Sequence, residues 1–131
     1  MLDEQHIQAR LPLWEALSDL WLDTELPDWQ IEGIARVMDE SGLTIDELWR
    51  VYSYEVAPVV YMNVYSFAGQ WVGFSPVWLR TEILRNLRDR PRRTRFWTLF
   101  PITRFLMLNQ THHAWKTLVA IVRRRRNERA V

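Results

Sequence analysis

Apolar side chains recur at intervals of three and four residues along most of this chain. The clearest stretch has leucines and tryptophans at five such positions: Leu13, Trp14, Leu17, Leu20 and Trp21. This spacing places them on one face of a helix, and it recurs in residues 28–40, 45–57 and 76–88. No two segments suggest strands that would pair. The pattern therefore predicts an all-α fold.

Residues that start and stop helices divide this pattern. Pro12 suits a first turn, so the first helix is expected to begin near Leu11. Asp28 is suited to cap the N-terminus of a second helix. Gly42 is placed to end that helix, because glycine tolerates the left-handed backbone that often follows a last turn. Residues 22–27 are expected to connect the two helices.

The third helix is expected to be bent. Thr44 and Glu47 have the spacing of a capping box at its start. Pro58 lies inside its apolar run and lacks a backbone donor, so a kink or a break is predicted just before it. The β-branched residues in 56–65 would also suit a strand, but a helix is preferred because no partner strand is apparent. Residues 66–75 are expected to form the main loop.

Two more helices are predicted in the second half. Ser75 and Pro76 suit the cap and first turn of one that ends near Arg88. Helical spacing after Pro101 predicts a long helix that ends in four arginines. A chain of 131 residues is one domain by size. We therefore expect residues 1–131 to form a compact, single-domain bundle of five to seven helices, with a proline-kinked central helix and a long basic C-terminal helix.

The charge of the chain is divided between its two halves. Residues 1–79 contain 13 acidic residues and three arginines, a net charge of −10. Residues 80–131 contain 14 basic residues and three acidic ones, a net charge of +11. Such an asymmetry indicates either an anionic partner for the basic half or packing of one half on the other.

The composition excludes several classes of site. The chain has no cysteine, which excludes disulfides and cysteine-ligated metals. Its acidic, polar N-terminus does not resemble a signal peptide, and no apolar run reaches the roughly 18 residues of a membrane span. We expect a cytoplasmic location, membrane-peripheral if the basic half binds lipid. Serine-nucleophile motifs, phosphate-binding loops and dinucleotide fingerprints are absent, so we expect neither enzymatic activity nor a cofactor.

Acidic side chains gather where the first predicted helix ends and the second begins. Two or three carboxylates can bind a divalent cation, but EF-hand spacing is absent, and solvated carboxylates or partners for arginines are favoured. His112 and His113 are adjacent, so on a helix they point about 100° apart and do not easily share a zinc ion. We expect no metal site. The acidic group is interpreted as a face for a basic partner: Asp19, Asp23, Glu25, Asp28 and Glu32.

Arginines dominate the second half and are the strongest functional signal. They form two clusters, the first of which precedes Phe96 and Trp97. Basic residues interleaved with aromatic ones suit nucleic-acid phosphates or an anionic membrane surface. A protein partner, the chain's own acidic half, or a solvated helix end are the alternatives. The basic face consists of Arg92, Arg93, Arg95, Arg123, Arg124, Arg125 and Arg126.

Glu55 and Asn63 are interpreted as structural polar residues. The neighbours of Glu55 are apolar, so its carboxylate is expected to be partly buried and to need an arginine or a free backbone donor. A role as general acid or base would need a partner histidine or second acid, and none is near in sequence. Asn63 is expected to bond the backbone of the following turn.

Three segments resemble a family of small uncharacterised proteobacterial helical proteins. They are LWEALSDLWLDTEL (Leu13–Leu26), EVAPVVYMN (Glu55–Asn63) and AGQWVGF (Ala68–Phe74), the last followed by Trp78 and Leu79. The resemblance implies that residues 1–90 are the core of the family and that residues 91–131 are a basic helical extension. It implies a bacterial cytoplasmic protein, and it carries no activity or catalytic residue.

The first functional hypothesis is a non-enzymatic interaction protein, such as an immunity or adaptor protein, that binds a basic partner through its acidic half. This role rests on analogy with other small helical proteins. The second is a peripheral membrane or nucleic-acid binder that uses the arginine-rich half. The third is an enzyme that uses Glu55. The sequence predicts no oligomeric state.

Overall fold

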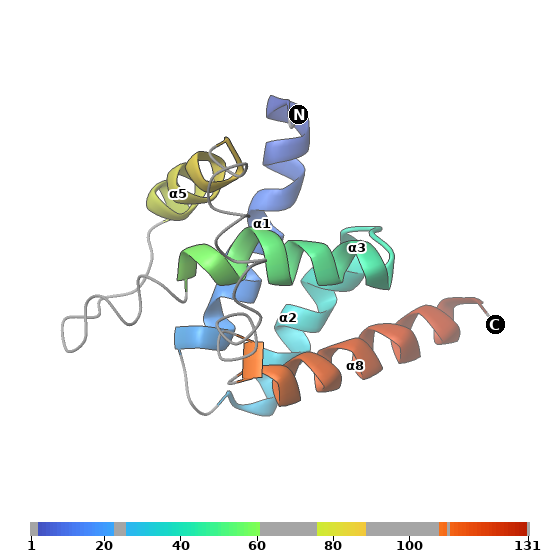
Figure 1. Cartoon of the computed structure of the whole chain (residues 1–131). Coiled ribbons are helices and arrows are strands. Elements are labelled where there is room, and N and C mark those ends of the chain that lie inside the picture. Colours follow the sequence, from blue (N-terminus) through green and yellow to red (C-terminus); the bar gives the residue numbers. More distant parts are fainter. Residues whose placement is uncertain (1–2, 23–25, 61–75, 89–107, 110, 131) are drawn as a thin grey trace.

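The computed structural model describes residues 3–22, 26–60, 76–88, 108–109 and 111–130 (Figure 1). Five helical segments lie within these residues, and none of their regular structure is extended. The all-α prediction is therefore confirmed. The elements are α1 (Glu4–Leu22), α2 (Asp28–Glu40), α3 (Ile45–Arg50), which continues into the π-helix η1 (Val51–Val56), α5 (Pro76–Arg88) and α8 (His112–Ala130).

Helix α1 begins earlier than predicted. It starts at Glu4, so the expected start near Leu11 is wrong, and Pro12 lies inside the helix. The start is fixed by Asp3, whose side-chain oxygen accepts the backbone N–H of His6 at 2.9 Å. An aspartate that bonds the third residue of a helix is an N-cap. The extra turns add Ile7 to the buried face, which explains why the helix extends past the proline.

Helix α2 and the turn after it follow the prediction closely. Pro27 occupies the N-cap position without a side-chain hydrogen bond, and Asp28 is the first residue of the helix, so the prediction of Asp28 as the cap is wrong by one position. Gly42 adopts the left-handed conformation that was expected, with φ of 75°. The Thr44 hydroxyl accepts the Glu47 N–H at 3.1 Å, and Glu47 in turn accepts the Thr44 N–H at 3.3 Å. The predicted capping box is confirmed.

The predicted disturbance before Pro58 takes the form of the π-helix η1. Proline has no N–H, and its ring clashes with the carbonyl four residues earlier in an α-helix. In η1 the wider turn shifts the bonding by one residue, so that the Ala57 N–H bonds the Tyr52 carbonyl. The chain stays helical through Val60, so the strand alternative is excluded for residues 56–60.

The core is built around four aromatic rings from α1, the α3–η1 helix and α8. Tyr52 stacks on Trp115 of α8 with ring centroids 4.4 Å apart and on Trp21 of α1 at 5.3 Å. Trp49 contacts both Tyr52 and Trp115. The Tyr52 hydroxyl is bonded to the hydroxyl of Thr111. Stacked pairs of this kind add about 0.5–1.5 kcal/mol each beyond the area that they bury.

Helix α8 lies beside α2, as Figure 1 shows, and brings the basic end of the chain onto the acidic half. The predicted C-terminal helix is confirmed from His112, but it continues to Ala130, past the four arginines at which it was expected to end. Its expected beginning after Pro101 lies outside the described residues. Helix α5 starts at Pro76 as predicted and packs on α1, where Arg80 bonds both carboxylate oxygens of Glu4 at 2.7 and 2.8 Å. The predicted loop at residues 66–75 also lies outside the described residues.

Candidate functional site

Glu55 is buried between η1 and α1 with both carboxylate oxygens bonded. Arg10 donates from Nη1 to one oxygen at 2.6 Å, and Trp14 donates from Nε1 to the other at 2.8 Å. The arginine that the sequence required for a buried Glu55 is thus Arg10, 45 residues earlier. Trp14 is fully buried, so its indole N–H has to be bonded inside the protein, and Glu55 supplies the acceptor.

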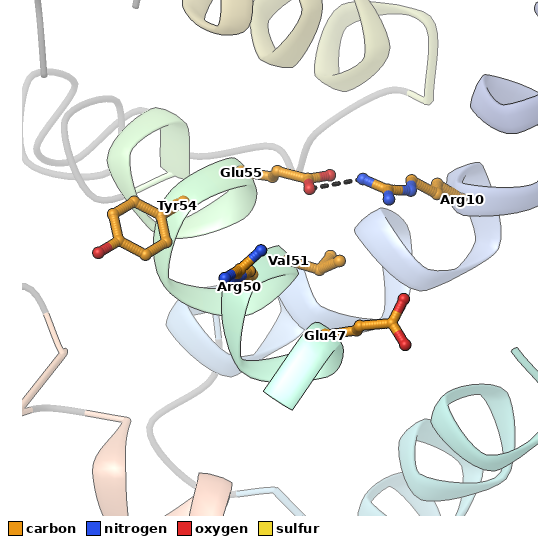
Figure 2. Close-up of a pocket in the computed structure, with 6 residues that line it drawn as sticks. All are labelled: Arg10, Glu47, Arg50, Val51, Tyr54 and Glu55. Atoms are coloured by element: carbon orange, nitrogen blue, oxygen red, sulfur yellow. Dashed lines mark hydrogen bonds and ion pairs between the residues drawn. The ribbon is translucent and has the colours of Figure 1, made fainter. Parts of the chain in front are cut away.

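A polar pocket of about 440 Å³ lies where Glu55 faces Arg10. Figure 2 shows these two side chains pointing toward each other between α1 and the α3–η1 helix. The pocket is lined by Arg10, Glu47, Arg50, Val51, Tyr54 and Glu55. Its volume lies within the range of small-molecule sites, roughly 300–1,000 Å³. Its lining is unusually charged for such a site.

The α3–η1 helix positions five of these six side chains. Glu47, Val51 and Glu55 are four residues apart, which places them along one side of the helix. Helix α3 continues into the π-helix η1 between Glu47 and Glu55. Short π-helical segments are frequent at functional sites. The sixth side chain, Arg10, comes from α1, so the packing of α1 on η1 completes the pocket.

The charges of the pocket fall into two pairs. The inner pair, Arg10 and Glu55, is bonded. In the outer pair, Glu47 and Arg50 are not bonded to each other. They are three residues apart on one helix, a spacing at which opposite charges can form an ion pair. Glu47 uses one oxygen in the capping box. Arg50 is exposed and forms no ion pair with the residues that the structure describes.

A second concentration of charge joins α2 to α8. The Asp39 side chain is fully buried and accepts hydrogen bonds from Arg125, Arg126 and Arg129. The bond from Arg129, with those from Arg125 and Arg126, holds the pKa of Asp39 well below its usual range, although burial acts in the opposite direction. Next to it, Arg124 pairs with Glu32 at 3.4 Å near the surface.

The predicted basic face is therefore partly engaged inside the protein. Among its C-terminal members, Arg124 contacts Glu32, and Arg125 and Arg126 contact Asp39. Arg123 is exposed. The chain's own acidic half, one of the alternatives for this cluster, is its partner at these positions. The remaining members of the predicted face, Arg92, Arg93 and Arg95, lie outside the described residues.

The structure describes three of the five residues of the predicted acidic face. Asp28 and Glu32 are exposed on α2, and Asp19 is half-buried near the end of α1. Asp23, Glu25 and the predicted structural residue Asn63 lie outside the described residues. His112 and His113 are both exposed in the first turn of α8. Across the described ranges, no three histidine, aspartate or glutamate side chains converge as metal ligands.

The outward face of α2 carries an exposed tryptophan. Trp29 is 76% exposed, whereas the core contains Trp14, Trp21 and Trp115. Gly33 follows one turn later on the same face, and a Cβ atom there would meet nothing within 4 Å. The exposure of Trp29 was not predicted from the sequence. Trp29 lies outside the apolar stripe of α2, and this position indicated that its side chain would be exposed. The stripe consists of Ile31, Ile34, Ala35 and Met38.

The roles of Asp39 and Arg10 were not predicted from the sequence either. Asp39 lies in the last turn of α2, where the helix dipole disfavours an acid, so its position indicated a nearby cation. Arg10 is one of only three arginines in the acidic half, and it lies four residues before Trp14 on the same side of α1. Neither feature indicated which residue forms an ion pair with Asp39 or with Arg10.

No helix in the described part of the chain combines the length and hydropathy needed to cross a membrane. A search of curated proteins found no match, and no solved structure matched the chain. The model of one family, described as Domain of unknown function (DUF7079), matches residues 8–121. This range includes α1, α2, the pocket-forming α3–η1 helix and the first half of α8. The chain therefore belongs to the DUF7079 family, in agreement with the uncharacterised family that its sequence resembled.

Proposed function

We propose that this protein is a non-enzymatic interaction module that binds a basic protein partner through the outward face of α2. The exposed Trp29 is the observation that carries the proposal. Exposure of a large indole to water is unfavourable, and its burial against a partner would be worth about 1.5–3 kcal/mol. Tryptophan is also among the residues that most often dominate binding energy at interfaces.

The charge around Trp29 favours a basic partner. Asp28 precedes it and is exposed. Glu32, one turn further along the helix, is also exposed, although it is paired with Arg124 at 3.4 Å. An aromatic anchor with a charged rim selects partners of the opposite charge and accelerates their association. The acidic half as a whole, with a net charge of −10 over residues 1–79, would add to this attraction.

Gly33 supports the same face. A glycine in a helix interior costs about 0.5–1 kcal/mol relative to alanine. No neighbouring atom requires it, because the space around its Cβ position is open within 4 Å. A partner that approaches the backbone of α2 closely beside the Trp29 ring would use that space. A bacterial immunity or adaptor protein in the cytoplasm is the role that fits a small module of this kind.

The alternative is a membrane or nucleic-acid binder that uses the arginine-rich half. The exposed Arg123 favours this alternative. The ion pairs of Arg124, Arg125 and Arg126 oppose it, because phosphates would have to displace Glu32 and Asp39 from them. The acidic half would also repel polyanions.

A capture experiment with matched variants tests the proposal. Tagged protein would be incubated with nuclease-treated bacterial lysate at low and high salt, in parallel with Trp29→Ala, Asp28→Asn and Val77→Ala. Val77, on α5, is the matched control because its side chain is also 76% exposed. We expect one stoichiometric basic protein that is lost with Trp29→Ala, weakened with Asp28→Asn and by high salt, and retained with Val77→Ala.

Three outcomes would contradict the proposal. One is capture that does not change with Trp29→Ala. Another is equal loss with Val77→Ala, which would indicate nonspecific adhesion to apolar surface. The third is recovery of lipid or nucleic acid instead of protein, which would favour the arginine-rich half. Circular dichroism of each variant would show that the helices are retained.

A further inference from the structure

We propose that the pocket between α1 and the α3–η1 helix binds a small zwitterion, a molecule that carries a carboxylate together with an ammonium or guanidinium group. This site is separate from the face of α2 that the proposed function uses. The inference rests on the two charge pairs of the pocket, which are Arg10 with Glu55 and Glu47 with Arg50.

The formal charge of the pocket lining is zero, but of its two charge pairs only Arg10 with Glu55 is bonded. Two guanidinium groups and two carboxylates line it. A simple anion would gain from the arginines and be repelled by the carboxylates, and a simple cation would meet the reverse. A zwitterion presents the opposite charge to each, so it is the ligand class with net electrostatic complementarity.

The inner pair is preorganised for such a ligand. Glu55 is held by Arg10 on one oxygen and by Trp14 on the other, so its position is fixed before a ligand enters. A carboxylate has about four acceptor sites and an arginine has five N–H donors. The bonds seen leave further acceptor positions on Glu55 and further donors on Arg10. Fixed groups of this kind reduce the ordering cost of binding.

The outer pair supplies charges that are not paired with each other. Glu47 and Arg50 are three residues apart on one helix, a spacing at which opposite charges can pair, yet no ion pair joins them. A ligand that bridges them would give each of these two side chains a partner of opposite charge. Val51 and Tyr54 also line the pocket, and their apolar surface is available to the ligand's carbon skeleton. The volume of about 440 Å³ is ample for a molecule the size of an amino acid.

Nuclear magnetic resonance provides a direct test, because the Trp14 indole N–H is bonded to Glu55 and reports on the pocket. The 15N-labelled protein would be titrated with glycine and L-alanine, both of which are zwitterions at neutral pH. Sodium acetate, methylammonium chloride and inorganic phosphate would serve as probes with a single kind of charge. We expect saturable shifts of the Trp14 indole and of α3 resonances with a zwitterion, and at least about tenfold weaker binding of the single-charge probes.

A matched pair of variants locates the site. Glu47→Gln removes the charge but keeps a side-chain oxygen for the capping box, since glutamine also serves at that position. Asp46→Asn removes a charge from the same first turn of α3, outside the pocket. We expect Glu47→Gln and Arg50→Gln to weaken zwitterion binding about tenfold or more and Asp46→Asn to leave it within about twofold.

The proposal is overturned if neither zwitterion produces saturable shifts in the wild type, or if acetate or phosphate binds as tightly as they do. Equal weakening by Asp46→Asn and Glu47→Gln would also overturn it, because the binding would then depend on overall charge. Since Trp29→Ala leaves the pocket intact, zwitterion binding and partner capture fail independently of each other.

Discussion

Arg129 donates hydrogen bonds to both carboxylate oxygens of Asp39, a residue 90 positions earlier in the chain. The Asp39 side chain is fully buried, and Arg125 and Arg126 donate to the same carboxylate. One carboxylate near the end of α2 thus anchors three arginines of α8. The acidic and basic halves of the chain are joined at this point, next to the apolar contacts between the two helices.

Replacement of Asp39 by asparagine is expected to destabilise the fold by about 2 kcal/mol. The substitution keeps the shape but leaves three guanidinium groups around a neutral amide. Breaking a fully buried ion pair costs about 3–5 kcal/mol, and the partial exposure of these arginines lowers the value because water can reach them. Urea unfolding would measure the effect. The exposed neighbour substitution Glu40→Gln should stay within about 0.5 kcal/mol, and equal effects would contradict the assignment.

Stability is expected to decrease in acid partly through Asp39. The pKa of Asp39 is lowered in the folded protein, so an unfolded chain binds a proton at pH values where the folded one does not. The contribution is fully present above the ordinary aspartate pKa of about 4 and is lost as the pH falls toward the lowered value. Unfolding free energies between pH 7 and about 3 should fall more steeply for the wild type than for Asp39→Asn. If unfolding free energy fell equally with pH in both proteins, Asp39 would be excluded as a source of the acid sensitivity.

Tyr52 is expected to resist ionisation in alkaline solution. Burial raises its pKa to about 12, against a smaller opposite effect of the bond to Thr111. Its contribution to stability is therefore full below about pH 10, the ordinary tyrosine pKa, and is lost as the pH rises toward the raised value. Ultraviolet titration should show a late tyrosine ionisation near pH 12. Tyr52→Phe should remove that late step and cost about 1 kcal/mol at neutral pH.

Two substitutions of Glu55 are expected to differ because of Trp14. Glu55→Gln keeps an oxygen that can accept the indole N–H, whereas Glu55→Met leaves that buried donor unbonded. An unsatisfied buried donor costs about 1–3 kcal/mol, so the methionine variant should be less stable by that amount. Urea unfolding of both variants, with exposed Glu15→Gln on α1 as control, would measure it. Equal stability of the two variants would show that Trp14 finds another acceptor.

Gly33→Ala is expected to stabilise the isolated protein by about 0.5–1 kcal/mol. Alanine is the better helix former, and nothing lies within 4 Å of the new Cβ atom. The same substitution should weaken partner binding if the partner approaches α2 at this position. Thermal unfolding and the capture experiment measure the two effects separately. A loss of stability would indicate a contact with Gly33 in the free protein.

The features that the sequence predicted correctly are encoded within a few residues. Gly42 ends α2 because of its own backbone freedom, and Thr44 bonds Glu47 three residues later. Pro58 indicated a disturbed helix but not a π-helix, because the missing donor can be accommodated by a kink, a break or a wider turn. The start of α1 was misplaced since Pro12 suits a first turn, whereas Asp3 was the true cap.

The site could not be predicted because its contacts are distant in sequence. Nothing local distinguishes Arg10 as the partner of Glu55, 45 residues away, or Arg129 as the partner of Asp39. The charge asymmetry indicated that the halves could pair, but a net charge does not specify which side chains meet. The exposure of Trp29 was missed because most tryptophans in a small domain are buried, and only the helical period set it apart.

The pairing of α2 with α8 has a consequence for synthesis. Ribosomes add roughly 5–20 residues per second. The 90 residues that separate Asp39 from Arg129 therefore take roughly 5–18 seconds to make. During that interval the buried face of α2, including Ile34 and Met38, has no α8 to cover it. A nascent chain in this state exposes apolar surface beside an unpaired carboxylate, and transiently exposed apolar surface is the feature that chaperones protect from aggregation.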